Sequence, residues 1–297
     1  MNNMKVAAIV VTYNRLIKLK KCLNSFENQT KKPDLLIIVN NASTDGTDLF
    51  LDEWRKTTSM SNTVLTAKEN EGGSGGFAIG IEYAVQNGFD WFYLGDDDAY
   101  PNNDCFQEFS SCLSKISGDV GAICGVVKDA KGISLMHRRT IKKGIFVFKE
   151  CNSKKEDYDM ASFNVDLFSF VGSFVKADIV SKIGLPIKDY FIWYDDSEYS
   201  YRITRLCKAL CFNSIEVFHD CSEANQVFSW KNFYGYRNKM DMLKRDVGVR
   251  YYRFFKLMLN ISSVADFFVN HPKYQAKKDA IKCAKKGILG KNSAYLP

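Results

Sequence analysis

Residues 6–40 read VAAIVVTYNRLIKLKKCLNSFENQTKKPDLLIIVN, and this stretch decides the predicted fold. Two short aliphatic runs rich in β-branched residues, VAAIVVTY and DLLIIVN, flank a segment with helical periodicity. The same alternation continues downstream, where the strand-like runs NTVLTA and DWFYLG are separated from their neighbours by helix-like stretches at 43–57 and 75–88. Because strands joined through helices pair in parallel, we expect an α/β fold with a ligand site at the carboxyl ends of its strands.

The composition is that of an ordinary globular protein. With 297 residues, 46% of them hydrophobic, the chain can bury the core of one large domain or of a domain with an appendage. Its nine cysteines are scattered without a C-x-x-C pair, which predicts reduced thiols in a cytoplasmic protein rather than a disulfide framework or zinc site. No segment approaches the roughly 18 apolar residues of a spanning helix, and the apolar run at the N-terminus is too short for a signal peptide.

The positive charge is concentrated at the C-terminal end. The formal net charge is +7, but residues 237–297 hold fourteen basic and four acidic side chains, a net +10 that leaves −3 for the rest. This region contains the stretch YYRFFKLMLNISSVADFFV at 251–269. Two interpretations stay open: an amphipathic element that lies on anionic lipid, or a helix that packs its aromatic face on the main domain with its lysines in water.

Polar side chains follow each of the four predicted strands. Thr12 and Asn14 follow the first, Asn40 and Asn41 the second, Asn70 the third, and three consecutive aspartates, 96–98, the fourth. Because the carboxyl ends of parallel strands meet at one edge of a sheet, these groups are expected to form one site.

The run FYLGDDDAYP at 92–101 places three carboxylates next to one another after an apolar strand. Adjacent ionised carboxylates repel, most strongly where water is excluded, so they either stay in solvent or are neutralised by a cation. The second option implies a metal ion. The glycine-rich stretch NEGGSGGFAIG at 70–80 would let backbone amides approach a phosphate, although a flexible loop explains four glycines equally well.

A second acidic cluster occurs in FIWYDDSEYSYR, at 191–202. Asp195, Asp196 and Glu198 begin a predicted helix directly after Trp193 and Tyr194. Such acids can simply complement the dipole of a helix N-terminus. Alternatively, burial behind the aromatic side chains raises the pKa of one carboxyl group and suits it to act as a general base.

Five segments in order, VTYNR, VNNASTDGT, NEGGSGGFAIGIEYA, GDDDAYP and YFIWYDDSEYSYRI, resemble the inverting GT-A-fold glycosyltransferases of family 2, especially the galactofuranosyltransferase and rhamnosyltransferase branch. The likeness runs from about residue 6 to 238, where WKNFYGYRN is similar to that branch's Tyr-x-x-Arg-Asn segment. It implies a GT-A, Rossmann-like fold with a mixed, mainly parallel sheet flanked by helices in a catalytic domain at 1–236. The nucleotide-sugar half would lie at about 1–128, the acceptor half at about 129–236, and a basic helical region at 237–297.

The resemblance also implies roles for individual residues. Asp96 and Asp98, with His219, would bind Mn²⁺ or Mg²⁺, and Asp196, with Asp195 beside it, would be the catalytic base. Contacts with the donor nucleotide would come from Thr12, Asn14, Arg15, Asn40, Asn41, Asn70, Gly73, Asp96 and Asp97. Contacts with the acceptor would come from Trp193, Tyr194, Glu198, Trp230, Tyr234 and Arg237. The chain departs from many relatives at Asn40, where they have aspartate, and at Tyr194, where many galactofuranosyltransferases have tryptophan.

The expected function is that of an inverting, metal-dependent glycosyltransferase of bacterial surface polysaccharide biosynthesis. The favoured donor is UDP-galactofuranose, with dTDP-rhamnose as the alternative, and the acceptor would be a glycan or lipid-linked glycan, reached from the cytoplasm or from the cytoplasmic face of the inner membrane. A non-catalytic nucleotide-sugar or glycan-binding module would use the same pocket. Nucleic-acid binding is disfavoured, because the basic region has no recognisable motif and the acidic clusters would repel phosphate in the absence of metal.

Overall fold

The computed structural model describes residues 4–116, 118–220 and 228–296. Its main sheet has the strand order β10-β13-β6-β12-β4-β1-β2-β3, with two short strands, β5 and β7, paired to β13 and β6. The strands are β1 (Val6–Thr12), β2 (Leu35–Asn40), β3 (Asn62–Thr66), β4 (Trp91–Asp96), β5 (Ala99–Pro101), β6 (Val120–Asp129), β7 (Gly132–Ile133), β10 (Ser162–Val165), β12 (Ser173–Lys176) and β13 (Lys208–His219). A second sheet has the order β11-β8-β9, from β8 (Arg138–Lys143), β9 (Phe148–Asn152) and β11 (Leu167–Phe168).

The predicted α/β class is confirmed, and most of the parallel pairing lies in the N-terminal half of the main sheet. There β1 pairs in parallel with both β2 and β4, and β2 pairs in parallel with β3. The second half is mixed, since β12 runs antiparallel to β4 and β6, while β13 runs parallel to β6. The expected mixed, mainly parallel sheet is therefore confirmed, and its parallel half carries the strand ends of the predicted site.

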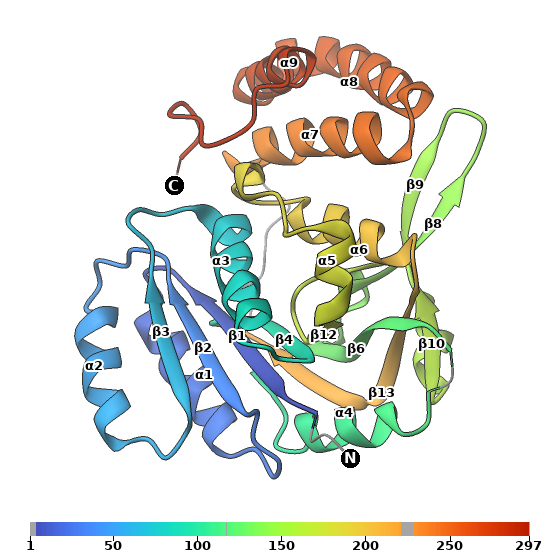
Figure 1. Cartoon of the computed structure of the whole chain (residues 1–297). Helices are drawn as coiled ribbons and strands as arrows, with labels where there is room; N and C mark the ends of the chain where they lie inside the picture. The colour runs from blue at the N-terminus through green and yellow to red at the C-terminus, as the bar shows by residue number, and fades with distance from the viewer. Residues whose placement is uncertain (1–3, 117, 221–227, 297) are drawn as a thin grey trace.

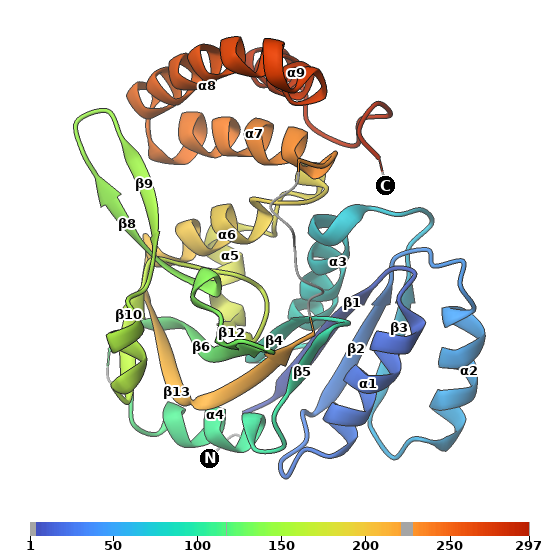
Figure 2. The same ribbon diagram turned by 180° about the vertical axis from the view of Figure 1, so that it is seen from behind.

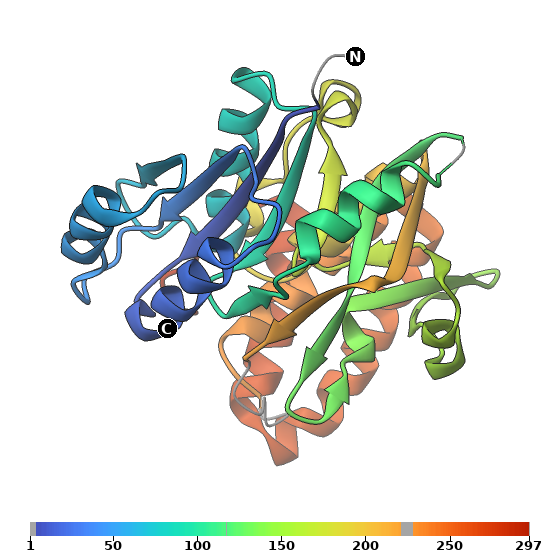
Figure 3. The ribbon, with the colours of Figure 1, turned by 90° about the horizontal axis from the view of Figure 1, so that it is seen from below.

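Helices cover both faces of the sheet (Figure 1). The α-helices are α1 (Leu16–Glu27), α2 (Thr47–Thr57), α3 (Gly72–Gln86), α4 (Cys105–Leu113), α5 (Val180–Ile183), α6 (Asp195–Thr204), α7 (Lys231–Met242), α8 (Val249–Val269) and α9 (His271–Lys286). Seen from below, α1 and α4 lie in front of the sheet and the C-terminal helices behind it (Figure 3).

The strand β1 is apolar throughout because both of its faces are buried. Ala8 and Val10 belong to the core formed with α1 and α4, whereas Ala7 and Ile9 belong to the core formed with α3. On the α3 side, a Cβ added to Gly80 would come within 2.4 Å of Ile9. Glycine therefore lets α3 lie directly against β1, which fixes the N-terminus of this helix near the strand ends.

The C-terminal helices form a layer on α7 that is continuous with the rest of the protein (Figure 2). Phe233 of α7, Leu259 of α8 and Ala280 of α9 share one core with Phe148 of β9 and Phe191. The aromatic face of the basic region therefore packs on the main domain, as the second of the two interpretations predicted. The boundary predicted after residue 236 falls inside α7, and the division predicted after residue 128 falls inside β6.

Eight cysteines lie in the described part of the chain, and all eight are free thiols, as expected. Cys221 lies outside the described residues. Among the helices of the described ranges, none is both long and apolar enough to cross a bilayer.

Candidate active site

The first predicted site element is the carboxyl edge of the parallel strands. In the pairing of β1 with β2, Thr12 lies opposite Asn40, and in the pairing of β1 with β4, Val11 lies opposite Asp96. The last residues of three neighbouring strands therefore meet at one edge, as the sequence analysis expected from the βαβ pattern.

Asp97 and Asp98 are buried and are held by side chains from β1 and α1. Thr12 donates a hydrogen bond from Oγ1 to Asp97 Oδ2 over 2.7 Å, and the Arg15 guanidinium lies 3.3 Å from Asp97 and 2.7 Å from Asp98. Lys18, one helical turn after Arg15, places its Nζ 3.5 Å from Asp98. The sequence analysis named Arg15 but missed Lys18, although its i+3 spacing from Arg15 was a usable signal.

A candidate metal centre is formed by Asp96, Asp98 and His219. One ligand atom from each of these residues lies within 4.8 Å of the others, and His219 Nε2 is 3.2 Å from Asp98 Oδ1. The short strand β5 pairs with the end of β13 so that His219 faces Ala99, which brings the histidine to the aspartates. Two carboxylates and an imidazole form a donor set that suits a divalent cation with mainly oxygen ligands, so the residues present fit such an ion.

The electrostatics of this cluster show an excess of negative charge. Burial and the neighbouring Asp98 carboxylate raise the pKa of Asp96 to about 7. Burial also acts to raise the pKa of Asp98, but the hydrogen bond with His219 and the charge of Arg15 outweigh burial, and this pKa is lowered. For His219, burial is outweighed by its contact with Asp98, so the histidine pKa is raised. A bound cation would favour the ionised form of Asp96 against both burial and the charge of Asp98.

Basic side chains surround the acidic cluster on the side of α1 and α7. Lys231, the first residue of α7, is half-buried, and its pKa is lowered by burial and by the charge of Arg15. The carboxylates of Asp96 and Asp98 act on the same ammonium group in the opposite sense. Lys231 joins Arg15 as a cation within reach of this cluster, and the sequence analysis did not single it out.

The asparagines of the strand ends hold the loops together. Asn41 Oδ1 accepts a hydrogen bond from the Glu71 amide, and Asn41 Nδ2 donates to the Gly72 carbonyl. Asn40 Oδ1 accepts from the Ser43 amide over 3.0 Å. Asn14 and Asn70 act in the same way, accepting from the backbone amides of Thr44 and Gly72. The residues predicted to contact the nucleoside are therefore close together, but their side-chain amides form hydrogen bonds with backbone groups of the loops.

The glycine-rich segment joins the strand ends to the second acidic cluster. Gly72 has φ +70°, and a Cβ there would come within 1.9 Å of the Phe191 carbonyl oxygen, so only glycine fits. The next turn is tied to the same carbonyl, which accepts a hydrogen bond from the Ser74 amide. At Gly73, the Cβ position lies 3.9 Å from Asp195 Oδ2. The start of α3 therefore lies against the loop and helix that carry Asp195.

The backbone before α6 is strained. Phe191, Trp193 and Tyr194 have φ of 65°, 64° and 67°, which is uncommon for residues with bulky side chains. A conformation of this kind costs on the order of 1–3 kcal/mol per residue and persists only when the surroundings hold it. The strained loop ends directly at Asp195 and Asp196, so it sets where both carboxylates point.

Asn238 of α7 holds this loop through hydrogen bonds. Its Nδ2 donates to the carbonyls of Tyr190, Ile192 and Trp193 over 3.0, 3.2 and 2.8 Å. Arg237 is buried beside it and donates to the Tyr190 carbonyl and, from Nε, to Asn238 Oδ1. The Arg-Asn pair of the WKNFYGYRN segment thus binds backbone carbonyls of the strained loop.

The two adjacent aspartates have different environments. Burial, with the charges of Asp196 and Asp96, raises the pKa of Asp195 to about 8. Asp196 is more open, with 26% of its side chain exposed; its Oδ1 accepts from the Ser197 amide, and its Oδ2 lies 3.8 Å from Arg139. The raised pKa is therefore found at Asp195, whereas the resemblance assigns the base to Asp196, which is the more exposed of the two carboxylates.

Glu150 of β9 contacts three side chains near the candidate site, and the sequence analysis did not identify it. It lies 2.7 Å from the Arg139 guanidinium and 3.0 Å from the Lys239 ammonium, and it accepts a hydrogen bond from the Tyr194 hydroxyl. Burial acts to raise the Glu150 pKa, but the charges of Lys239 and Arg139 outweigh it and the pKa is lowered. Arg139 also lies 3.8 Å from Asp196, and Tyr194 directly precedes Asp195. Glu150 therefore connects β9 to both residues of the candidate catalytic pair.

Three of the six predicted acceptor residues lie inside the protein, which does not fit direct acceptor contact. Glu198 is fully buried between Arg202 and Arg245, at 2.5 and 2.7 Å. Tyr234 is fully buried and donates to the Tyr295 carbonyl, and Arg237 binds the strained loop. The family resemblance implied acceptor contacts for these residues, but Arg245, the Tyr295 carbonyl and the Tyr190 carbonyl hold their side chains inside the protein.

The other three keep some surface. Trp193 is 42% exposed and lies over Gly235, whose Cβ position would be 2.9 Å from the indole ring. Trp230 is partly exposed and packs edge-on against Tyr234. Tyr194 is partly exposed, although its hydroxyl is already bound to Glu150. Trp193 is thus the most accessible aromatic face next to Asp196.

Replacing Asn238 by alanine is expected to lower both stability and turnover. The loop carbonyls lose their donor, which we expect to cost about 1–3 kcal/mol in the free energy of unfolding. Relaxation of the strained loop moves Asp196, so kcat should fall by about tenfold or more with little change in donor KM. Thermal melting and steady-state kinetics measure both effects, with Asn260→Ala in α8 as the matched control. A drop in activity that only mirrors the folded fraction would contradict the positioning role.

The raised pKa of Asp195 predicts a pH-dependent stability. The folded protein keeps this proton up to about pH 8, whereas the unfolded chain loses it at about pH 3.9. Between these values the folded state binds more protons, so the free energy of unfolding falls as pH rises, by at most about 1.4 kcal/mol per pH unit. Melting temperatures in EDTA should therefore decline with pH more steeply in the wild type than in Asp195→Asn, and parallel profiles would contradict the assignment.

A doubly covered α/β sheet, with a carboxylate and imidazole cluster at its strand ends and a second acid pair across a glycine-rich turn, defines a GT-A-type glycosyltransferase fold. The profile described as Glycosyl transferase family 2 matches residues 7–182. The chain belongs to this family, which confirms the resemblance seen in the sequence.

Relatives and solved structures agree with this placement. The chain is 30% identical over 207 residues to galactofuranosyltransferase GlfT1 of Mycolicibacterium smegmatis, covering 67% of this chain and 65% of that protein, so it spans just under two thirds of that relative. GlfT1 of Mycobacterium tuberculosis is 29% identical over 203 residues, with 67% and 64% covered. The fold is similar to TarS 1–349 of S. aureus, with a TM-score of 0.60 at 14% identity over 95% of this chain and 81% of that one. A mannosyltransferase of Pyrobaculum calidifontis, solved with GDP-Man and Mn²⁺, has a TM-score of 0.58 at 16% identity over 99% and 78%.

Proposed function

We propose that the chain is an inverting glycosyltransferase that transfers galactofuranose from UDP-galactofuranose to a glycan or lipid-linked glycan of the bacterial surface. The observation that carries the proposal is the meeting of two acidic clusters. Asp96, Asp98 and His219 converge in the first cluster, and the charge of Asp96 acts on Asp195 of the second, which lies 3.9 Å from the Cβ position of Gly73. The identity to GlfT1 favours galactofuranose, and dTDP-rhamnose remains the alternative donor.

On the donor side, we assign the diphosphate to the candidate metal centre and its cations. When bound there, Mn²⁺ or Mg²⁺ would supply charge stabilisation to the departing nucleotide diphosphate. Arg15, Lys18 and Lys231 add positive charge at the same edge, and the loops tied by Asn41 form the wall against which the nucleoside would lie.

On the acceptor side, we assign Asp196 as the general base. An acceptor hydroxyl would give its proton to Asp196 while its oxygen attacks the anomeric carbon, and the bond from that carbon to the diphosphate oxygen would break on the opposite face. Asp195, protonated at neutral pH and adjacent to Gly73, faces the donor side and is suited to donate a hydrogen bond to the sugar. Trp193 offers a flat apolar face to the acceptor sugar.

The catalytic domain in this proposal corresponds to 1–236, with a donor half at about 1–128 and an acceptor half at about 129–236. The helical region at 237–297 is coupled to catalysis through Asn238, which holds the loop before Asp195. We place the protein in the cytoplasm, in contact with the cytoplasmic face of the inner membrane.

A panel of nucleotide sugars with Mn²⁺ tests the proposal. We expect UDP-galactofuranose to be hydrolysed slowly, and to be transferred faster when a galactan acceptor is present. Transfer from dTDP-rhamnose alone would support the alternative donor, and exclusive transfer of a hexopyranose from UDP-glucose would contradict both. Tight nucleotide-sugar binding without any turnover would instead support a non-catalytic binding module.

A further inference from the structure

The loop between β8 and β9 is an exposed apolar tip. Ile145 is 75% exposed, Phe146 55% and Val147 44%, and these three residues are consecutive at the end of the hairpin. Exposed lysines stand on both arms, at 142, 143 and 149. A run of large apolar side chains in solvent, bordered by basic groups, is unusual on a protein surface unless something covers it.

The outer face of α8 is apolar as well. Its inner face is buried through Tyr252, Leu259 and Ser263. Four large residues at spacings of four, three and four recur on the opposite side, where all are exposed: Leu257, Ile261, Val264 and Phe268. A helix with one buried face and a second apolar stripe in solvent has a face without a partner.

The hairpin tip and the start of α8 form one continuous surface. The rings of Phe146 and Phe254 are stacked with centroids 6.3 Å apart, and the Tyr251 hydroxyl donates to the Gly144 carbonyl over 3.2 Å. Figures 1 and 2 show the hairpin rising beside α8. We call residues 145–147 together with the outer face of α8 the apolar surface.

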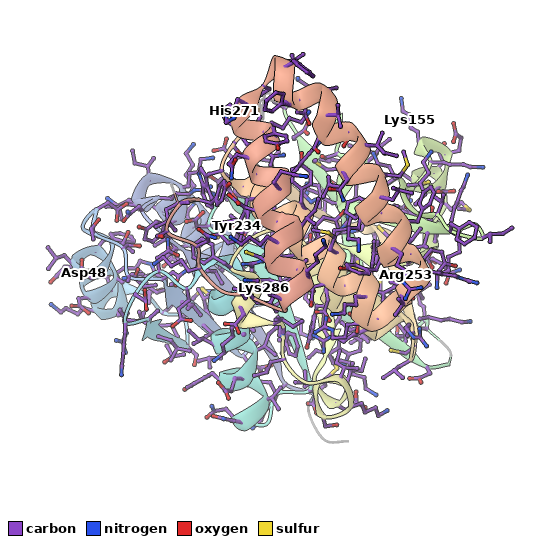
Figure 4. All side chains as sticks on the ribbon, turned by 90° about the horizontal axis from the view of Figure 1, so that it is seen from above. Asp48, Lys155, Tyr234, Arg253, His271 and Lys286 are labelled. Atoms are coloured by element: carbon purple, nitrogen blue, oxygen red, sulfur yellow. The ribbon has the colours of Figure 1, made fainter. Side chains whose placement is uncertain are left out.

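The surroundings of the apolar surface are basic. Residues 249–286 contain nine lysines and arginines but only two acids, Asp266 and Asp279. Asp266 is paired with Lys273 and Lys277, and Asp279 accepts a hydrogen bond from Tyr295; nine bases against two acids leave this stretch a net +7. Seen from above, α8 and α9 lie side by side, with Arg253 and Lys286 toward the end of the pair that is away from His271 (Figure 4).

We propose that the apolar surface docks on an anionic lipid bilayer, with the hairpin tip and the outer face of α8 in the headgroup region. Charge complementarity favours lipid over a second copy of the chain, because a copy would bring two sets of basic side chains together. This inference deepens the proposed contact with the inner membrane: it adds the hairpin, which the sequence analysis did not identify, and it defines which face of α8 is involved.

Docking at the hairpin would connect the membrane to the active site. The same two strands that carry the tip carry Arg139 and Glu150, and Arg139 lies 3.8 Å from Asp196. Glu150 accepts the hydrogen bond of Tyr194 next to Asp195. The candidate base and the membrane-facing tip are therefore held by one antiparallel ribbon, which would suit an acceptor glycan attached to lipid.

Co-sedimentation with vesicles tests the docking surface on the full chain. The probes are phosphatidylglycerol vesicles and phosphatidylcholine vesicles at low salt, and the same vesicles at about 1 M salt, where the Debye length falls to about 3 Å. The variants are the triple change Ile145→Ser, Phe146→Ser, Val147→Ser and the double change Leu257→Ser, Ile261→Ser. The matched control removes exposed apolar side chains elsewhere, by Leu49→Ser and Leu206→Ser.

We expect the wild type and the control to bind phosphatidylglycerol vesicles at low salt, and each test variant to bind at least about tenfold more weakly with an unchanged melting temperature. Wild-type protein that stays in the supernatant, or test variants that bind like the control, would overturn the proposal. So would analytical ultracentrifugation that shows a wild-type dimer and a monomeric hairpin variant without vesicle binding, because the surface would then join two copies. The readout requires no turnover, so a failure of the proposed function is detected separately.

Discussion

Replacing Asp196 by asparagine is expected to lower kcat by about 10²–10⁴-fold, the range for loss of a general base. The amide cannot take the proton of the acceptor hydroxyl, but it keeps the shape of the side chain and its contact with Ser197. Donor binding should remain near the wild-type value, because a base acts in the transition state and not in the ground state. Initial rates with a galactan acceptor give kcat, and calorimetric titration with UDP-galactofuranose gives the donor affinity.

Two further variants separate the candidate base from its surroundings. Asp195→Ala should weaken donor binding as well as turnover, because it removes the hydrogen bond that Asp195, beside Gly73, is proposed to donate to the sugar. Asp178→Asn, an exposed acid paired only with Lys176, should leave both values unchanged. A rate near wild type for Asp196→Asn would remove this residue from the mechanism and would make Asp195 the remaining acid of the pair.

The half of the fold that the sequence predicted well is the half governed by local rules. Continuous apolar runs separated by helical periodicity allow parallel pairing, and parallel pairing places Thr12, Asn40 and Asp96 at one edge without further information. The repulsion among three consecutive aspartates left two options, solvent or a cation, and the structure buries Asp97 and Asp98 and brings Asp96 and Asp98 to His219 in a group that could hold a metal ion.

The rest of the site depends on contacts between distant segments, which local patterns do not contain. His219 meets Asp98 because β5 pairs with the end of β13, and only the family resemblance had indicated this histidine. Glu198 shares a helix with the candidate catalytic pair, yet its partner Arg245 comes from beyond α7 and helps to bury it away from the proposed acceptor site. Likewise, the binding of Glu150 to Tyr194 requires β9 to fold back toward α6.

Backbone strain explains why the loop before Asp195 could not be predicted from the sequence. Positive φ at three aromatic residues before Asp195 opposes their intrinsic preferences, so no propensity argument predicts that loop. It becomes intelligible only with Asn238, whose amide group reaches three of its carbonyls from α7. The C-terminal helices thus contribute to the site by holding a conformation that the segment would not adopt alone.

Removal of divalent cations is expected to abolish transfer, and Asp98→Asn should make the loss permanent. In EDTA the diphosphate would meet the Asp96 and Asp98 carboxylates without a bridging charge, so activity should return when Mn²⁺ or Mg²⁺ is added to the wild type. The variant loses one of three converging ligands, and its affinity for Mn²⁺, measured by electron paramagnetic resonance in the absence of donor, should fall by about tenfold or more. Asp52→Asn, which changes an exposed acid on α2, should bind Mn²⁺ like the wild type. Full turnover in excess EDTA, or unchanged Mn²⁺ binding by Asp98→Asn, would show that the cluster of Asp96, Asp98 and His219 is held by the cations of Arg15 and Lys18 alone.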